Sequence, residues 1–343
     1  MSPRVEILLP THDHALMLPL AIATAQEQTV PPARIVVIGD GVGDDTRDVM
    51  AALCREDADT VFVDLPKAGR TGERHRHRVL VDSEADIVTY LSDDDLMFPD
   101  HVERMVALIE HCDVALPMGS HLLPDGVVES SPWSLGEEPG RTMACKGTSL
   151  FSLSGLSHTM ASYRRLPHGW RDTPEGFYTD QYMLLQFLHE DWCRFDVSDV
   201  PTIVHLADSL RRDMSPSQRF DELRDVADRM RRRGGWTEYR RLVQSHLRRT
   251  AAQLMVDMNS AAEHVGDLSR RNDDLAAQVG ELETRHVELT ARSEELAAEL
   301  SDLRRSYDER CAELDALMGT RTMRARNAFV RSRVMRALLS RRR

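Results

Sequence analysis

The chain has 343 residues, of which 41% are hydrophobic, 29% are charged and only 5% are aromatic. This length exceeds one typical domain of ~100 to 200 residues, so a single small binding module is excluded. The low aromatic content indicates that part of the chain builds no globular core.

Charge is distributed unevenly along the chain. The formal net charge is −12, yet the last 25 residues hold nine arginines and no acidic residue, which leaves −21 for residues 1–318. An acidic body argues against nucleic-acid binding. The cationic tail is a candidate contact for an anionic surface such as a membrane.

The cysteines and the N-terminus indicate a cellular compartment. The five cysteines show no CxxC or Cys/His metal spacing, a pattern typical of reduced cytosolic thiols. The first residues pass directly into a strand pattern without a secretory signal, and no run of 18 apolar residues occurs. We therefore expect a cytoplasmic protein that spans no membrane.

Residues 4–117 alternate short β-rich runs with helical stretches. Strands are expected at 5–9, 34–39, 60–65 and 86–91, and helices near 15–28, 45–56, 72–83 and 99–111. This alternation predicts βαβ units and a parallel sheet. Ligands of such sheets bind beyond the carboxyl ends of the strands, where this sequence places Thr11-His12-Asp13, Asp40 and Ser92-Asp93-Asp94-Asp95.

Carboxylates clustered at one sheet edge repel one another unless a cation or hydrogen-bond donors compensate. Oxygen ligands suit Mg²⁺ or Mn²⁺, which commonly bind one or two carboxylates together with substrate phosphates. The pattern therefore indicates a nucleotide diphosphate held through a divalent cation. The alternative is that Asp93, Asp94 and Asp95 only form a turn before the next helix.

Residues 118–212 are less regular and continue the same domain, with a helix near 178–190 and a strand near 200–205. From Leu247 onward leucine recurs at almost every seventh position, and a second column, mixed in character, follows four residues after it. This spacing predicts a coiled coil of about ten heptads, and Asn272 in the second column favours a parallel dimer. The alternative is a long helix packed on its own domain.

The C-terminal segment mixes arginines with apolar residues at roughly helical spacing. These apolar residues are Met323, Phe329, Val330, Val334, Leu338 and Leu339. Such a helix either lies in a membrane interface, held by apolar burial and attraction to anionic lipid, or forms a solvated basic tail.

The first 110 residues resemble the family 2 glycosyltransferases. The motif Pro10-Thr11-His12-Asp13 is similar to the family's first strand-end motif, Gln28-Thr29 to the end of its first helix, and Gly39-Asp40-Gly41 to its second strand-end motif. The block EADIVTYLSDDDLMFPDHVERMVALIE resembles the family's DxD block. The resemblance implies an α/β, GT-A-like (Rossmann-like nucleotide-diphospho-sugar transferase) fold and an inverting transfer from a nucleotide sugar, with a UDP-sugar favoured.

The resemblance also implies roles for individual residues. Those implied to bind the nucleotide sugar are Pro10, Thr11, His12, Asp13, Asp40, Arg76 and Asp93, with Arg78 as the alternative to Arg76. The other interpretation of either arginine is that it belongs to a solvated basic loop. Asp94 and His205 are implied as ligands of Mg²⁺ or Mn²⁺, and Asp180 as the general base. Two departures from the family pattern are Ser92, in place of the first DxD aspartate, and His12, in place of a tyrosine.

We therefore expect four segments: a GT-A-like domain (1–212), a helical connector (213–246), a parallel coiled coil (247–318) and a basic amphipathic tail (319–343). The expected function is sugar transfer to a glycan or lipid-linked acceptor in cell-envelope polysaccharide or glycolipid synthesis. The expected assembly is a homodimer at the inner face of the membrane, with no nucleic-acid partner. The alternatives are a catalytically degenerate dimeric scaffold and a nucleotidyltransferase that releases pyrophosphate.

Overall fold

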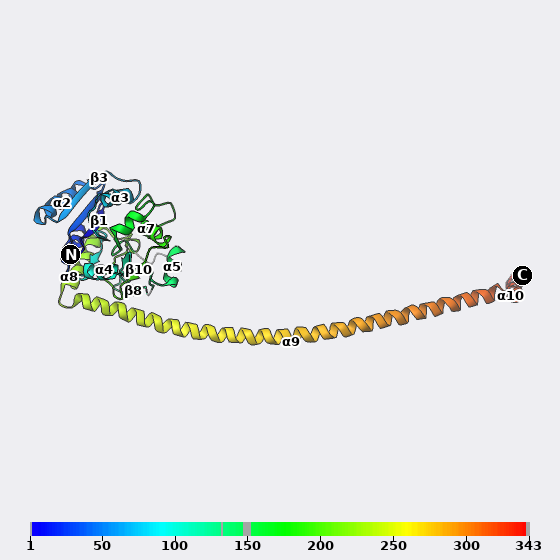
Figure 1. The fold of residues 1–343 in the computed structure, drawn as a ribbon. Helices are drawn as coiled ribbons and strands as arrows, with labels where there is room; N and C mark the ends of the chain where they lie inside the picture. The colour runs from blue at the N-terminus through cyan, green and yellow to red at the C-terminus, as the bar shows by residue number, and fades with distance from the viewer. Residues whose placement is uncertain (1, 132, 147–151, 341–343) are drawn as a thin grey trace. The chain divides into compact units, whose positions relative to one another are not determined.

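The computed structural model describes residues 2–131, 133–146 and 152–340 (Figure 1). The chain divides into two units, one ending at Leu254 and the other beginning at Met255. The first unit contains a mixed α/β fold, and the second is helical.

A seven-stranded sheet lies at the centre of the first unit, in the order β10-β6-β9-β4-β1-β2-β3. Its strands are β1 (Val5–Thr11), β2 (Arg34–Asp40), β3 (Thr60–Leu65), β4 (Ile87–Tyr90), β6 (Val114–Leu116), β9 (Ser157–Thr159) and β10 (Phe195–Val197). Neighbouring strands pair in parallel, except that β9 runs antiparallel to β4 and β6. The expected α/β sheet is confirmed, while the antiparallel β9 is an addition that the sequence pattern did not predict.

The central strands are buried on both faces because helices cover the sheet on each side. Leu8, Val36 and Val88 belong to one hydrophobic cluster, whereas their neighbours Ile7 and Ile35 belong to the other. This alternation follows from the two-residue repeat of a strand. Side chains of α1 (Leu18–Gln26), α2 (Asp44–Glu56) and α4 (His101–Ile109) join one cluster, and side chains of α3 (Glu73–Val81), α6 (Met160–Arg165) and α7 (Thr179–Leu188) join the other.

Smaller elements flank this sheet. Strand β5 (Leu96–Met97) pairs antiparallel with β11 (Ile203–Val204), so the strand expected near 200–205 lies outside the main sheet. Strands β7 (Ser120–Leu122) and β8 (Val128–Ser130) form a hairpin. Helix α5 (Glu138–Cys145) and a 3₁₀ turn at Asp208–Leu210 complete the set.

The segment expected to be a connector contributes instead to the core of the first unit. Helix α8 (Pro216–Arg231) begins with a capping box formed by Ser215 and Gln218. The first turns of α9 (Gly235–Gly319) bury Tyr239 against Phe98, with ring centroids 5.7 Å apart. The domain therefore extends beyond residue 212, because the apolar faces of α8 and early α9 pack on it.

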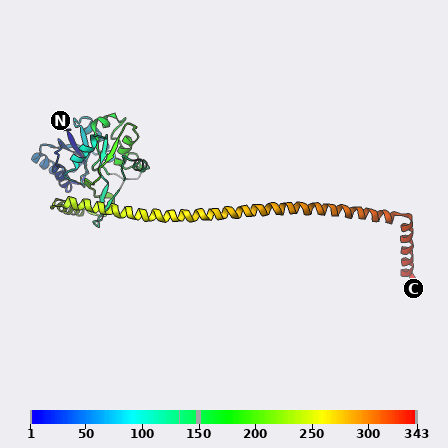
Figure 2. The same cartoon turned by 60° about the horizontal axis from the view of Figure 1, so that its bottom comes forward.

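Beyond the first unit the chain is helical. Figure 2 shows α9 as one uninterrupted helix, which has 85 residues and is followed by α10 (Arg321–Ser340). The leucines of the heptad column are exposed in the single chain, for example Leu275 at 58% and Leu282 at 66%. Within the described residues no helix is long and apolar enough to cross a membrane.

Candidate functional site

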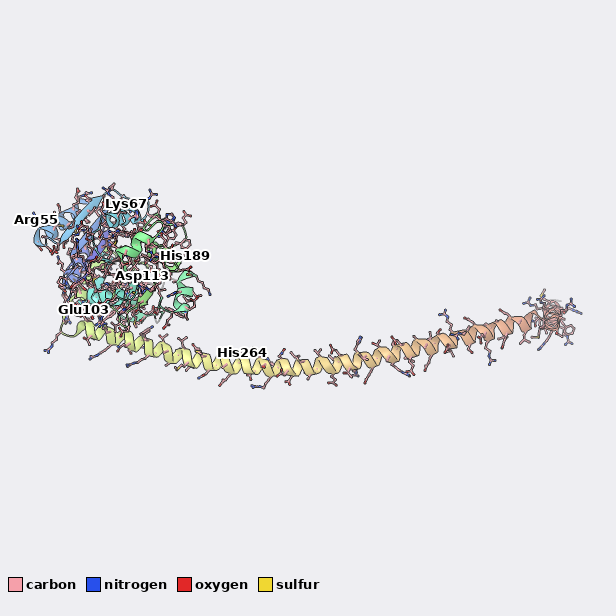
Figure 3. The ribbon with its side chains drawn as sticks, in the orientation of Figure 1. Arg55, Lys67, Glu103, Asp113, His189 and His264 are labelled. Atoms are coloured by element: carbon pink, nitrogen blue, oxygen red, sulfur yellow. The ribbon has the colours of Figure 1, made fainter. Side chains whose placement is uncertain are left out.

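The strand ends that the sequence pattern singled out are neighbours in the sheet. Because β4, β1, β2 and β3 are adjacent and parallel, Thr11, Asp40 and the triplet Asp93–Asp95 follow strands that end at the same edge. Lys67, labelled in Figure 3, lies just beyond the end of β3 at this edge.

Asp40 is held at the end of β2 by donors from the loop that follows β3. Lys67 Nζ donates to Asp40 Oδ2 at 2.5 Å, and the Ala68 amide donates to Oδ1 at 2.6 Å. Burial raises the pKa of Asp40, but these donors outweigh it and keep the pKa below its ordinary value. Gly41 permits this approach: its φ is +68°, and a Cβ there would lie 2.6 Å from Lys67 Cβ.

Each carboxylate of the triplet has a different set of partners. Asp93 accepts from Thr11 Oγ1 at 2.6 Å and from His14 Nδ1 at 2.9 Å. Asp94 Oδ2 accepts from Arg219 Nη2 at 2.6 Å. Donors from residues 11–14 and from Arg219 therefore compensate the negative charge of Asp93 and Asp94.

Asp95 is fully buried and belongs to a structural network with His205. Its Oδ2 accepts from Ser154 Oγ at 2.5 Å and from His205 Nδ1 at 2.8 Å, and its Oδ1 accepts from the Leu206 amide at 2.9 Å. Burial raises the pKa of Asp95, but His205 and the other donors lower it overall. His205 meets the ring of His121 edge-on, with centroids 4.8 Å apart.

Asp94, and His14 next to Asp93, have strongly shifted pKa values. Burial, together with repulsion from Asp95 and Asp93, raises the pKa of Asp94 to about 7. The hydrogen bond to Asp93 raises the pKa of His14 to about 9, against the opposing effect of burial. The site therefore combines closely packed acidic and cationic groups.

Arg76, in α3, is a buried cation with unused hydrogen-bonding capacity. It is 4% exposed, and its Nε and Nη1 have no hydrogen-bond partner among the residues that the structure describes. Its guanidinium lies 4.9 Å from the ring centre of Trp170, whose Nε1 donates to Tyr90 Oη at 2.8 Å. A buried charge without hydrogen bonds is costly, so this arrangement favours an anionic ligand.

Asp180 lies in the first turn of α7. Its Oδ1 accepts from the Gln181 amide at 2.8 Å. Burial raises its pKa, although His205 and Arg76 act in the opposite direction. The preceding residue ties α7 to the loop after β3, because Thr179 Oγ1 lies 2.9 Å from Thr71 Oγ1.

The predicted residues fall into two groups. Thr11, Asp93 and Asp94 meet through shared partners, and Asp40, Arg76, Asp180 and His205 lie close enough to influence one another's pKa values. Pro10 is half-buried in β1, whereas His12 and Asp13 are exposed in the bend after it.

Four residues of this site were not predicted: His14, Lys67, Ser154 and Arg219. Lys67 comes two residues after the end of β3, so the strand-end rule applied to the loop after β3 would have found it. Arg219 reaches Asp94 from 125 positions away in the sequence, a contact that no local pattern indicates.

A divalent cation finds a limited set of protein donors here. Among the described residues no three His, Cys, Asp or Glu side chains form a group that could hold a metal ion. The Asp95 bond occupies His205 Nδ1 and leaves Nε2 available, an orientation typical of metal-binding histidines. Asp94 and His205 are the two candidate ligands, and diphosphate oxygens and water would have to complete the coordination of a cation.

Comparison with known proteins gives a family for part of the chain. Residues 6–168 match the family model described as Glycosyl transferase family 2. No curated protein matches the chain.

Among solved structures, S. aureus TarS 1-349 in complex with UDP-GlcNAc is 17% identical, with a TM-score of 0.48 over 60% of this chain and 58% of that chain. The same protein in complex with UDP is 18% identical, with a TM-score of 0.46 over 66% of each chain. These similarities are too low to assign an activity, and the chain spans less than two thirds of the first of these structures. The family match identifies residues 6–168 as a family 2 glycosyltransferase domain, and the seven-stranded mixed sheet is the α/β fold expected for such a GT-A domain.

Proposed function

We propose that the chain is an inverting glycosyltransferase that moves a sugar from a nucleotide sugar to an acceptor hydroxyl. The observation that carries this proposal is the buried guanidinium of Arg76, two of whose nitrogens lack a partner among the described residues. A diphosphate supplies the acceptors and the negative charge that this side chain needs. A domain that serves only as a scaffold has no need for a buried guanidinium without hydrogen-bond partners.

The donor nucleotide occupies the edge where β1, β2 and β4 end. Thr11 and Asp40 contact the nucleoside base, and Asp93 lies where the ribose and the diphosphate approach; Pro10, His12 and Asp13 line the same strand end. Hydrogen bonds fix Asp40 and Asp93 before the ligand arrives, which reduces the cost of ordering them. A UDP-sugar is the donor that we propose to test first.

Asp180 acts as the general base. It takes the proton of the acceptor hydroxyl while that oxygen attacks the anomeric carbon, and the bond from that carbon to the diphosphate breaks on the opposite face. The burial that raises the pKa of Asp180 strengthens it as a base. Arg76 stabilises the charge that develops on the leaving nucleoside diphosphate.

A divalent cation, Mg²⁺ or Mn²⁺, held by Asp94 and His205 would supply further positive charge at the same leaving group. His205 presents Nε2 because Asp95 holds its other nitrogen. Ser92 adds no carboxylate, so the diphosphate itself has to complete the coordination.

The second unit pairs with a second copy of the chain in a parallel coiled coil. Helices in proteins gain most of their stability from packing on other elements. Helix α9 has 85 residues and an exposed leucine column that a partner helix would cover. Asn272, at an inward position of the repeat, favours the two-stranded register.

The basic tail contacts an anionic membrane surface, which would place the enzyme near acceptors of cell-envelope polysaccharide or glycolipid synthesis. In α10, at about 100° per residue, Met323, Val330 and Val334 share one face with arginines on both sides. Phe329 and Met335 lie on other faces, so the helix is less amphipathic than expected. The side chains of Leu338 and Leu339 and all of Arg341, Arg342 and Arg343 lie outside the described residues.

Product analysis tests the proposed function. The purified chain is incubated with UDP-, GDP- and dTDP-sugars, and the released products are separated. Release of a nucleoside diphosphate supports sugar transfer or its hydrolytic counterpart. Release of pyrophosphate in the presence of a nucleoside triphosphate and a sugar phosphate would indicate a nucleotidyltransferase, and no release from any donor would favour the scaffold.

A further inference from the structure

Arg219 reaches the carboxylate triplet from α8, outside the residues that match the family model. Its Nη2 donates to Asp94 Oδ2 at 2.6 Å, and its Nη1 lies 3.4 Å from His14 Nε2. The Arg219 and Asp94 side chains are only 12% and 13% exposed, so water screens their attraction weakly. This ion pair is therefore a feature of the site rather than of the surface.

Packing of helix α8 on the first unit fixes the position of Arg219. Leu223 and Val226, on the same helix, are buried in the hydrophobic cluster that also contains Phe98. Ahead of them, Arg211 is buried and pairs with Glu222 through two hydrogen bonds of 2.6 Å. The guanidinium of Arg219 is thus presented to Asp94 by a helix that is fixed on both sides.

The ion pair and a divalent cation compete for the same carboxylate. Asp94 Oδ2 already accepts a charge-assisted hydrogen bond, and a cation bound to that oxygen would lie next to the positive guanidinium. The cation should therefore bind Asp94 more tightly when Arg219 moves to another anion. A diphosphate is such an anion, because the guanidinium of arginine forms bidentate hydrogen bonds with phosphate oxygens.

We propose that Arg219 is a positioning residue that makes cation binding depend on the nucleotide: it holds Asp94 in the free protein and transfers to the diphosphate when cation and nucleotide bind together. This inference rests on the proposed nucleotide-sugar site. In this proposal α8 takes part in binding the nucleotide sugar. Asp94 pairs with the guanidinium of Arg219 in the free protein and with the divalent cation when the nucleotide is bound.

The test is a calorimetric titration of the full chain with Mn²⁺ alone and with Mn²⁺ in the presence of UDP. Arg219→Gln is compared with Arg224→Gln, a matched change on the same helix where the arginine pairs with exposed Asp221 and Asp225. We expect Arg219→Gln to bind Mn²⁺ alone about 10-fold more tightly, since a hydrogen bond to a charged group no longer opposes the cation. Its gain in Mn²⁺ affinity on adding UDP should shrink, because UDP then has no guanidinium to draw away from Asp94 and this part of the coupling between the two ligands is lost.

Arg219→Lys keeps the charge and should fall between the wild type and Arg219→Gln, which also serves if the glutamine variant does not fold. Arg224→Gln should match the wild type. Unchanged or weaker Mn²⁺ binding in a folded Arg219→Gln, or Mn²⁺ binding in neither protein, would overturn the role of Arg219. Failure of the wild type to bind any nucleoside diphosphate would instead overturn the proposed nucleotide site, while the Mn²⁺-only comparison would still decide whether Arg219 competes for Asp94.

Discussion

At the scale of single residues, the environment of Asp180 matches the demands on a general base. The carboxylate must be ionised when the acceptor hydroxyl arrives, yet basic enough to take its proton. Burial raises the pKa of Asp180, while His205 and Arg76 hold the shift in check by favouring the charged form. The net effect is a pKa above the ordinary value for an aspartate, which makes Asp180 a stronger base than an exposed aspartate.

Asp180→Asn should therefore lower the rate of sugar transfer by about 100- to 10,000-fold, the usual contribution of a general base. The affinity for UDP should change little, because Asp180 faces the acceptor in the proposed geometry. The rate is measured as nucleoside diphosphate release from the best donor, and the affinity is measured by calorimetry. A variant with full activity would eliminate Asp180 as the base.

The lowered pKa of Asp40 predicts that the stability of the fold depends on pH. Its pKa in the folded protein lies below the ordinary value of 3.8, so the ionised form is stabilised by folding. This contribution is present above about pH 4 and is lost as the pH falls through the lower folded pKa. The free energy of unfolding of the wild type should exceed that of Asp40→Asn at pH 7, and the difference should shrink toward pH 3. Denaturant unfolding at four pH values measures it; a difference that grows as the pH falls would contradict the assignment.

Local sequence predicted part of this site and not the rest. Thr11, Asp40 and Asp93 could be predicted because they directly follow apolar strand runs and because the strand ends of a parallel sheet share an edge. Arg219 could not be predicted, since its position depends on how α8 packs. His14 lies three residues beyond β1, in a bend whose direction the strand pattern does not define.

At the scale of elements, the long helix α9 changes character at the boundary between the two units. Its first turns bury Tyr239 and Val243 in the domain, whereas the leucine column beyond Leu254 is exposed in the single chain. The first turns of the helix thus pack on its own domain, and the exposed leucine column is the surface that we propose pairs with a second copy. Local periodicity indicated the second part and gave no sign of the first.

Leu275→Glu combined with Leu282→Glu should convert the dimer to a monomer, because both side chains lie in the column that a partner helix would cover. Ala277→Glu, on the opposite side of the heptad, is the matched control and should leave the dimer intact. Light scattering coupled to gel filtration gives the mass of each. A wild-type chain that is monomeric at micromolar concentration would contradict the coiled coil.

The secondary structure shows which elements the sequence can predict. The four βα pairs of residues 4–117 and helix α7 lie close to their expected positions, because each combines an apolar run with clear periodicity. Strand β9 has only the sequence Ser157-His158-Thr159, which is short and polar, and the neighbouring β4 and β6 determine its pairing. For helix α8 the sequence predicts only a connector, because its apolar face alone does not identify the surface that it covers.

At the scale of the whole molecule, opposite charges are separated along the chain. Residues 1–318 carry a formal net charge of −21, while nine arginines follow at the C-terminus. A cationic segment attracts anionic lipid within a Debye length of the surface, about 10 Å at 0.1 M salt. In the proposed arrangement, this separation would allow the tail to bind an anionic membrane while the acidic residues 1–318 are repelled from it.

Deletion of residues 319–343 should abolish co-sedimentation with vesicles rich in phosphatidylglycerol, and 0.5 M salt should weaken binding of the full chain by screening its charge. Phosphatidylcholine vesicles should bind neither protein. The truncated chain should retain its affinity for UDP, because the proposed site lies wholly in the first unit. Undiminished sedimentation of the truncated chain with anionic vesicles would rule out the tail as the membrane contact.

The most direct test of the whole account is a titration of the full chain with UDP in the presence of Mn²⁺, carried out on the wild type and on Arg76→Gln. We expect binding to the wild type and a loss of about 10- to 100-fold in affinity for the variant, which removes a buried charged donor to the diphosphate. We also expect the ligand-free variant to be at least as stable as the wild type, because a buried cation with unbonded nitrogens has been replaced. Equal affinity of both proteins for UDP, or no binding of UDP, GDP or dTDP to a folded wild type, would contradict the assignment of this edge of the sheet as a nucleotide-sugar site.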